Sequence, residues 1–527
     1  MPFRNLLFAF LSALGLLTAG SGAARAEVLR WAAQRDILSL DPHSVGSTGN
    51  LAFTNHIYEG LLRFSAEFTL EPALATSWEA IGEGLVWRFH LRKGVRFHDG
   101  AEFNADDVVA SLKRFTAEGA PMRGNLPFFE SVTRVDDFTV DIAVSAPGAL
   151  FLNDLSVVQM MDAGWLAAHD SLKATSVAAG TNGYATFHAN GTGPFRLESR
   201  QPDIATILTR NPDWWDKAAH NIDRIEFTPV VNATTRLIAL LSGNVDLIDG
   251  VPLKDLSMVT STPGLRLISM GELRMVMLGF NRRETLADGR PNPFNDSRIR
   301  EAVSLALDRD YLVQRVMRGL AKPSDSLVAP EIAGYVPEQD YAPEYDPDRA
   351  RQLLTEAGAL GLEFSILCAS DETVNEEATC RAIHSMLRKV GFAPKLDIAL
   401  RAIQSPRRAA GEGDIFLMSW ANEPSLDSFS ILSQVLTSPE SEMPVANFGG
   451  WSLPRIDELA RAAREEPDTG RRHALQAEAI SLAQKDRLLL PLYQQPLTWG
   501  VSARLSEFAM RPDNRARHWL TRMAPSE

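Results

Sequence analysis

Helix and strand patterns alternate along the second half of the chain, and this alternation constrains the fold more than any other feature. A helix is predicted to start at Asp346-Pro347, with proline in its first turn, and to end at Gly358. The apolar run Leu362–Cys368 predicts a buried strand, which a helix over about 375–390 and a strand over Pro394–Leu400 follow. Alternating units of this kind predict an α/β lobe.

The length and charge of the chain limit what else it can be. A chain of 527 residues is too long for one compact core and predicts two or three lobes. The formal charge is −13, and the first 26 residues contribute Arg4, Arg25 and no acid, so the remainder carries −15. This acidic balance argues against a nucleic-acid partner, which requires a basic face.

The first 26 residues have the pattern of a secretory signal. Arg4 is followed by an apolar stretch, Leu6–Gly20, that is short for a membrane span. Ala24-Arg25-Ala26 matches a signal peptidase site, so we expect cleavage after Ala26, with Glu27 as the first mature residue. No cysteine near this site offers a lipid attachment point, and the expectation is an exported, periplasmic protein. The alternative is a retained membrane anchor.

The chain has two cysteines, Cys368 and Cys380. Their spacing matches no zinc motif, because no second pair of cysteines or histidines accompanies them. Export permits a disulfide between them. Two unpaired, partly buried thiols are an equally weighted alternative.

The stretch 85–115 combines an alternating strand pattern with a well-marked helix start. Apolar and polar residues alternate over 85–91 and again over 95–98, which predicts a β-hairpin. Asn104, with Asp107 three residues later, has the form of a capping box, so a helix is expected to begin there.

Two histidines in this stretch, His90 and His98, raise the question of a metal or acid–base site. Both lie on the polar face of the predicted hairpin, and no local residue supplies a third ligand. Asp106 and Asp107 fall in the first turn of the predicted helix, where the helix dipole favours negative charge. The stretch is therefore interpreted as scaffold.

The segment Ala73–Phe115 resembles the signature of the bacterial extracellular solute-binding proteins of family 5, the periplasmic receptors of peptide, oligopeptide and nickel ABC importers. The segments Leu29–His43 and Gly191–Asp216 resemble other parts of the same family. The matching positions of the signature are Trp78, Trp87, Phe89, Leu91, Arg92, Gly94, Phe97, Asp99, Gly100, Phe103, Ala105, Asp107, Val108 and Arg114. In this family the signature is framework, which agrees with the local interpretation.

The resemblance implies an α/β, two-lobed periplasmic binding protein fold, with a ligand cleft between the lobes and an extra subdomain inserted in the first lobe. After the signal, residues 1–26, the implied pieces are lobe one over 27–55, 190–275 and 496–527, the inserted subdomain over 56–189, and lobe two over 276–495.

The run Ile415–Phe429 is the strongest candidate for the ligand site. A buried strand is predicted to end at Trp420, and ligands of α/β lobes gather at the carboxyl ends of strands. Trp420 offers a flat apolar wall. The loop after it offers Asn422, Glu423 and Asp427, and an acid there would pair with a ligand ammonium. The alternative is an ordinary acidic loop beside a core tryptophan.

The family's peptide receptors have a similar tryptophan followed by a Gly-Asp pair, and an acid of that run binds the peptide amino group. This chain lacks the Gly-Asp pair and its loop is one residue shorter, so Glu423 is the candidate replacement. Trp451, in a second framework turn, and Asp41, after the first predicted strand, are further candidates for ligand contact.

The family's dipeptide receptors also use an arginine to bind the ligand carboxylate. The matching position in this chain is Glu377 or Ala378, with Arg381 one turn later. This anchor is therefore not carried over, which argues against a strict dipeptide specificity.

No catalytic or cofactor motif is visible, whether a nucleophile elbow, a zinc-protease helix, a phosphate loop or a dinucleotide fingerprint. The main hypothesis is a non-enzymatic, monomeric receptor without cofactor or bound metal. It would close around a peptide or peptide-like solute and deliver it to an inner-membrane ABC permease with its ATPase subunits. The alternatives are a receptor for nickel chelates or sugar derivatives and, from another class, an exported hydrolase on the same fold.

Overall fold

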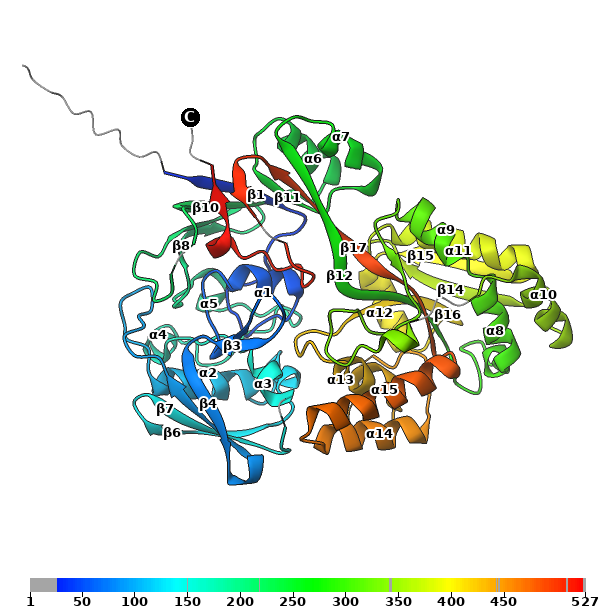
Figure 1. The fold of residues 1–527 in the computed structure, drawn as a ribbon, viewed down its shortest axis with the longest axis horizontal. Helices are drawn as coiled ribbons and strands as arrows, with labels where there is room; N and C mark the ends of the chain where they lie inside the picture. The colour runs from blue at the N-terminus through cyan, green and yellow to red at the C-terminus, as the bar shows by residue number, and fades with distance from the viewer. Residues whose placement is uncertain are drawn as a thin grey trace, which may run out of the picture.

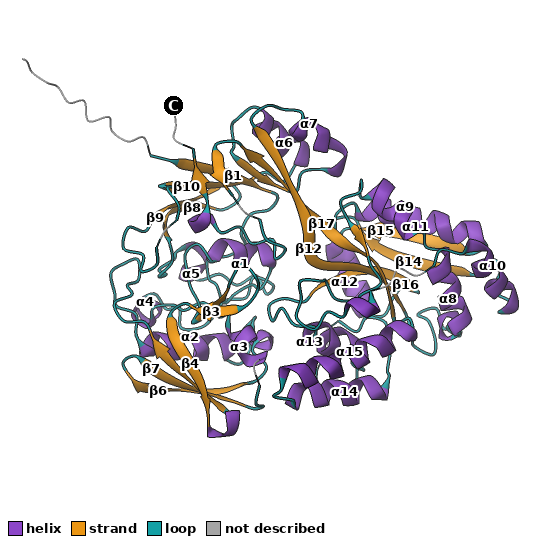
Figure 2. Ribbon diagram, in the orientation of Figure 1, coloured by secondary structure: helices purple, strands orange, loops and turns teal. Residues whose placement is uncertain are grey.

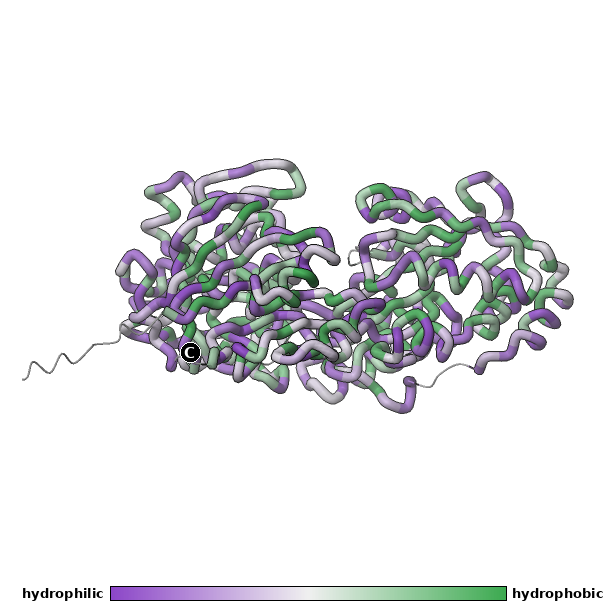
Figure 3. The backbone as a smooth tube through the Cα atoms, turned by 90° about the horizontal axis from the view of Figure 1, so that it is seen from above, coloured by the Kyte–Doolittle hydropathy of each residue, from purple (hydrophilic) through white to green (hydrophobic). Residues whose placement is uncertain are grey.

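The computed structural model describes residues 26–148, 150–217, 219–340, 344–441, 443, 446–508 and 510–524. Apart from Ala26, the predicted signal segment lies outside the described residues. The backbone N–H of Glu27 donates to Asp223 at 2.9 Å, just before the first strand. The chain forms two halves that lie side by side (Figure 1, Figure 3).

One mixed sheet of eleven described strands runs through both halves, in the order β15-β14-β16-β12-β17-β11-β1-β10-β9-β8, with β13 beside β17. In the first half its strands are β1 (Val28–Ala33), β8 (Phe195–Gln201), β9 (Ala205–Arg210), β10 (Arg224–Pro229) and β11 (Leu247–Asp249). In the second half they are β13 (Lys322–Pro323), β14 (Glu363–Ala369), β15 (Ala393–Ala399) and β16 (Ile415–Ala421).

Two long strands, β12 (Leu265–Phe280) and β17 (Leu489–Ser502), join the halves (Figure 1). They pair antiparallel along most of their length, with a register shift between Gly271 and Met275. The lobe boundaries expected from the sequence, at 275/276 and 495/496, fall inside these two strands. A register shift bends a strand pair locally, so this point is suited to be the hinge between the halves.

A second sheet lies in the first half, in the order β4-β5-β7-β6. Its strands are β4 (Ala75–Ile81), β5 (Val86–Leu91), β6 (Phe129–Asp136) and β7 (Thr139–Val144). The helix α2 (Ala105–Thr116) contacts this sheet, and its capping box between Asn104 and Asp107 is confirmed.

The predicted hairpin in this region is wrong in its second strand. Over residues 95–98 only Arg96 forms a β-bridge, with Glu102, and no strand is present; β5 pairs instead with β4 and β7. Val95 and Phe97 are nevertheless buried. Their alternation with polar residues therefore arises because a tight loop packs these two side chains against the core.

The histidines of this stretch serve the scaffold in the structure. His98 contacts the carbonyl oxygen of Gly193 through Nε2 at 3.0 Å, and His90 lies on the surface of β5, 3.7 Å from Glu79. No group of three or more potential metal ligands occurs among the described residues.

Helices cover the strands of the second half (Figure 2). The predicted helix start at Asp346 is confirmed, because its side chain caps α10 (Pro347–Glu356), and α11 ends where predicted, at Gly391. The helices here are α8 (Ser297–Ala306), α9 (Arg309–Tyr311), α10, α11 (Glu376–Val390), α12 (Arg401–Ala409), α13 (Phe429–Ile431), α14 (Pro454–Glu465) and α15 (Thr469–Lys485).

The remaining helices and short strands belong to the first half and the C-terminal segment. They are α1 (Thr48–Thr54), α3 (Leu150–Leu155), α4 (Ala163–Ala168), α5 (Tyr184–Phe187), α6 (Ala233–Leu241), α7 (Leu256–Thr260), β2 (Leu62–Phe64), β3 (Leu70–Pro72), β18 (Leu505–Glu507) and β19 (Arg522–Met523). Within the described part of the chain, no helix is long and apolar enough to cross a membrane.

The two cysteines form a disulfide in the structure. Cys368, in β14, is joined to Cys380, in α11, with their Cα atoms 6.6 Å apart. The bond fastens α11 to the strand that it covers.

The halves are in direct contact below the two long strands. One buried apolar cluster includes Phe151 of α3, Leu426 of the loop after β16 and Leu459 of α14. The side-chain amide of Asn153 donates to the carbonyl oxygen of Ser425 across the same boundary, at 2.6 Å. Apolar packing and a hydrogen bond therefore join the two halves at this boundary.

Candidate functional site

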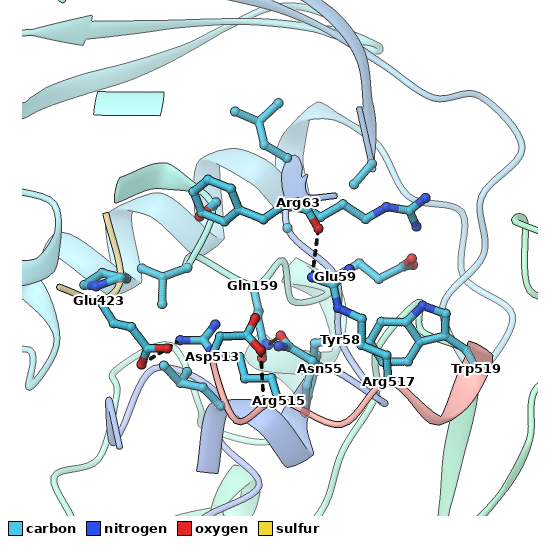
Figure 4. A pocket seen from close by; sticks show the side chains of 18 of the residues that line it. Asn55, Tyr58, Glu59, Arg63, Gln159, Glu423, Asp513, Arg515, Arg517 and Trp519 are labelled. Atoms are coloured by element: carbon cyan, nitrogen blue, oxygen red, sulfur yellow. Dashed lines mark hydrogen bonds and ion pairs between the residues drawn. The ribbon is translucent and has the colours of Figure 1, made fainter. Parts of the chain in front are cut away.

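A pocket lies between the first half, the loop after β16 and the C-terminal segment (Figure 4). Its cavity volume is about 80 Å³, and the pocket is partly open to solvent. In this arrangement it is smaller than the usual small-molecule site. Its lining residues are Leu51, Asn55, Tyr58, Glu59, Gly60, Leu62, Arg63, Phe64, Ala73, Ser156, Val157, Gln159, Pro194, Trp214, Glu423, Pro424, Leu426, Asp513, Arg515, Arg517 and Trp519.

Glu423 is the predicted site residue that the structure places in this pocket. It follows the end of β16 and reaches across to the first half, where its carboxylate accepts a hydrogen bond from the hydroxyl of Thr48 at 2.9 Å. The guanidinium of Arg515 lies 3.5 Å from the same carboxylate oxygen. Burial raises the pKa of Glu423, and the positive charge of Arg515 opposes that rise.

Asn422 and Asp427 hold the loop in place rather than lining the pocket. Asn422 is fully buried, and its side-chain oxygen accepts from the backbone N–H of Ile431 at 3.1 Å. The Asp427 carboxylate, 1% exposed, accepts from Gln476 at 3.0 Å and lies 3.3 Å from Arg472. These bonds fix the path of the loop and hence the position of Glu423.

The two predicted tryptophans also lie outside the pocket. Trp420 is half-buried, packs on the large apolar cluster and donates from Nε1 to the hydroxyl of Ser430 at 3.2 Å. Trp451 is 1% exposed, and its Nε1 donates to the carbonyl oxygen of Val435 at 2.9 Å. Both side chains are held by the core of the second half.

Asp41 is likewise placed away from the pocket, in a buried ion pair with Arg114 of α2. The two side chains are joined by two hydrogen bonds, of 2.6 and 2.8 Å. Burial alone would raise the pKa of Asp41, but the bonds and charge of Arg114 outweigh it and hold that pKa below its ordinary value. This pair fastens the loop after β1 to the helix α2.

The segment that matched the carboxylate anchor of dipeptide receptors borders a different hollow. Ala378 and Arg381, on α11, line a recess that also contains Lys254 and Arg315. Arg381 pairs with Glu377 on the same helix, at 2.7 Å. The pocket of Glu423 therefore receives no arginine from α11.

The C-terminal segment supplies pocket residues that the sequence patterns did not indicate. Between Arg511 and Arg517 the chain has three arginines within seven residues, although it is acidic overall. Two of them, Arg515 and Arg517, line the pocket together with Trp519. This local excess of arginine is the signal from which the segment could have been found.

Glu59 is a second carboxyl group at the pocket. It accepts hydrogen bonds from the indole N–H groups of Trp214 and Trp215, at 3.2 and 2.9 Å, and from the hydroxyl of Thr192 at 2.8 Å. Burial raises the pKa of Glu59 to about 7, although these donors favour the ionised form. Glu59 is therefore partly protonated at neutral pH.

Several polar atoms at the pocket have no hydrogen-bond partner among the described residues. They are the hydroxyl of Tyr58, the side-chain oxygen of Gln159 and Nε of Arg515, all buried. A buried polar atom without a partner is costly.

Comparison with known proteins gives a consistent relationship over most of the chain. A family model described as bacterial extracellular solute-binding proteins, family 5 Middle, matches residues 69–442. Glutathione-binding protein GsiB of Salmonella choleraesuis is 26% identical over 517 residues, covering 96% of this chain and 96% of that protein. Heme-binding protein A of Haemophilus influenzae is 32% identical over 336 residues, covering 60% of this chain and 58% of that protein.

Solved structures share the fold. The periplasmic binding protein DppA from Helicobacter pylori, in complex with the peptide STSA, has a TM-score of 0.78 and 24% identity, and the match covers 94% of this chain and 98% of that one. HbpA2 from Haemophilus parasuis has a TM-score of 0.78 and 25% identity, with 94% and 100% covered.

Proposed function

The chain belongs to the bacterial extracellular solute-binding proteins of family 5, and we propose that it binds a peptide or peptide-like solute in the pocket between its halves. It then delivers that solute to an inner-membrane ABC permease with its ATPase subunits. The protein acts as an exported, periplasmic monomer, without lipid attachment and without catalysis.

The position of Glu423 is the observation that carries the proposal. This carboxylate comes from the second half, and it faces a pocket whose other walls come from the first half and the C-terminal segment. A ligand ammonium beside it gains a charge-assisted hydrogen bond in a place sheltered from water. Pairing with that ammonium would also favour the ionised form of Glu423.

A ligand held in this pocket touches both halves at once. It therefore stabilises the closed arrangement relative to an open one, by the difference in its affinity for the two. The pair β12 and β17, with its register shift near Gly271, is the connection about which the halves would open. The permease would recognise the closed, loaded form.

The relatives support a peptide-like ligand. GsiB matches this chain along nearly its whole length and is a glutathione-binding protein, and glutathione is itself a small peptide. The structural neighbours include a complex with the tetrapeptide STSA and a dipeptide-binding protein in complex with Met-Leu.

Two measurements test this function. Protein purified from the periplasm without unfolding is denatured, and the released compounds are identified by mass spectrometry. Ligand-free protein is then titrated calorimetrically with glutathione, Ala-Ala-Ala and Ser-Thr-Ser-Ala. We expect a released compound with a free amine and binding of at least one probe. Release of no such compound, together with no binding in the panel, would contradict the proposal.

A third measurement separates a receptor from a hydrolase on the same fold. The protein is incubated overnight with the same three peptides, and the mixture is analysed by mass spectrometry. A receptor leaves every peptide intact. Accumulation of cleavage products, absent from a control incubated with heat-denatured protein, would contradict a role without catalysis.

A further inference from the structure

Arg517 differs from the other arginines near the pocket in having no acidic partner. Arg63 pairs with Glu71 at 2.7 Å and with Asp216 at 2.9 Å. Arg511 pairs with Asp513 at 3.4 Å, and Arg515 with Glu423 at 3.5 Å. Among the described residues, no carboxylate lies within 4.0 Å of the guanidinium of Arg517.

The surroundings of Arg517 add positive charge. Its Nη2 donates to the backbone oxygen of Phe64 at 2.8 Å, and the ring of Trp519 lies 5.9 Å from the guanidinium carbon. Burial, together with the positive charges of Arg511, Arg515 and Arg63, lowers the pKa of Arg517 to about 10, although the negative charge of Asp513 opposes that fall. The group therefore remains protonated at neutral pH.

A sheltered cation of this kind is unfavourable for the ligand-free protein. Removing a charge from water without a counter-charge costs stability, and nearby like charges add to that cost. An anionic group arriving from the ligand would supply the missing partner. Arginine suits this role, because its planar fork can bind a carboxylate through two parallel hydrogen bonds.

The pocket has opposite electrostatic character at its two sides. In Figure 4, Glu423 lies on the left with Arg515 beside it, whereas Arg517 and Trp519 lie to the right. Tyr58 and Gln159, whose buried oxygens have no partner among the described residues, lie between them. An acid on one side and an unpaired base on the other match the charge distribution of a zwitterion.

We propose that Arg517 is the anchor for a carboxylate of the solute, so that the pocket selects molecules with an ammonium for Glu423 and a carboxylate for Arg517. This inference rests on the proposed function. It places the carboxylate anchor on the C-terminal segment of the first half, whereas the dipeptide receptors that the sequence resembles take theirs from the segment before the helix corresponding to α11.

The test compares the binding of two peptides with that of derivatives in which one carboxylate is blocked. Calorimetry is run with Ala-Ala-Ala and its C-terminal amide, and with glutathione and its glycine monoethyl ester. The variants are Arg517→Gln, Arg517→Lys, which keeps the charge, and Arg522→Gln, which removes an exposed arginine of β19.

We expect the wild-type protein and Arg522→Gln to prefer the free acid by about tenfold or more. Arg517→Gln should bind the free peptide and its amide or ester equally. Arg517→Lys should retain part of the preference for the free peptide. Equal binding of acid and blocked form by the wild-type protein would overturn the anchor and leave the proposed function standing. A full preference in Arg517→Gln would do the same.

Failure of both peptide pairs to bind the wild-type protein would count against the proposed function instead. The anchor is then decided by thermal unfolding in sodium succinate against sodium chloride of equal ionic strength. Succinate should raise the Tm of the wild-type protein and Arg522→Gln but not that of Arg517→Gln. Equal Tm values in the two salts for the wild-type protein would overturn the anchor.

Ligand-free stability separates an anchor from a structural residue. Without ligand, Arg517→Gln should unfold at the same Tm as the wild-type protein or higher, because it removes an unpaired, half-buried charge. Unfolding of both Arg517→Gln and Arg517→Lys at clearly lower temperature would show a structural role and overturn the proposal.

Discussion

The carboxylate of Glu423, in the loop after β16, lies 3.5 Å from the guanidinium of Arg515, in the C-terminal segment. This ion pair joins the second half of the molecule to the segment that completes the first half. It also lies at the pocket, where a ligand ammonium would compete with Arg515 for the same carboxylate. A contact that joins the two halves and the contact that would bind the ligand therefore share one side chain.

The first prediction concerns this side chain. Glu423→Gln should weaken the binding of an amine-bearing solute at least about tenfold, because an uncharged amide cannot replace a carboxylate beside an ammonium. The Tm of the ligand-free protein should change little, because glutamine can still accept from Thr48 and the burial cost of the carboxylate charge, which disappears, offsets the lost ion pair with Arg515. Calorimetry with glutathione and Ala-Ala-Ala measures the affinity, and Glu507→Gln, at an exposed site in β18, is the control. Unchanged affinity for a probe that the wild type binds would show that the loop is scaffold.

The second prediction distinguishes Asp427 from Glu423. Asp427→Asn should lower the free energy of unfolding by about 3 kcal/mol, because it leaves the buried Arg472 without its counter-charge. Affinity, measured at a temperature where the variant is folded, should be nearly that of the wild-type protein. Urea unfolding and calorimetry on the same preparation give both values. A large loss of affinity with unchanged stability would instead place Asp427 at the ligand.

The third prediction concerns pH. The pKa of Glu59 is raised by burial from an ordinary value of 4.5 to about 7. Between these pH values the folded protein keeps a proton on Glu59 that the unfolded chain has lost. Stability should therefore fall as the pH rises through this window, by up to about 3 kcal/mol, and return on acidification.

The difference between the wild-type protein and Glu59→Gln isolates this contribution. Urea unfolding at pH 5 and pH 8 should show a smaller loss of stability in the variant, while Glu118→Gln, at an exposed site, behaves as the wild type. The same pH dependence in all three proteins would assign the effect to other groups.

The fourth prediction concerns the disulfide between Cys368 and Cys380. Replacing both cysteines with serine should lower the free energy of unfolding by about 3 kcal/mol, as the chain-entropy model gives for a loop of this length. Wild-type protein reduced before unfolding should match the double variant. Equal stability of oxidised, reduced and variant proteins would mean that the bond contributes nothing to folding.

Local sequence patterns predicted those elements whose determinants lie within a few residues of one another. The capping box at Asn104 and the Asp346-Pro347 start each specify a helix through bonds within one turn, and both are present. The hairpin prediction failed over 95–98 for the opposite reason. An alternating pattern reports which side chains are buried, and a tight loop packed against the core produces the same pattern as a strand.

The candidate site divides in the same way. The sequence by itself determined that β16 ends in an acidic loop, and its resemblance to a family indicated Glu423 as the residue to examine. Only the tertiary structure decided that Asp427 and Asp41 each form a buried ion pair. It also decided that Arg515 and Arg517 complete the pocket. Arg517 meets Phe64 across 453 positions of sequence, and Glu423 meets Thr48 across 375. Contacts over such separations leave no local pattern, because they arise only when the chain returns to complete the sheet that its first strand began.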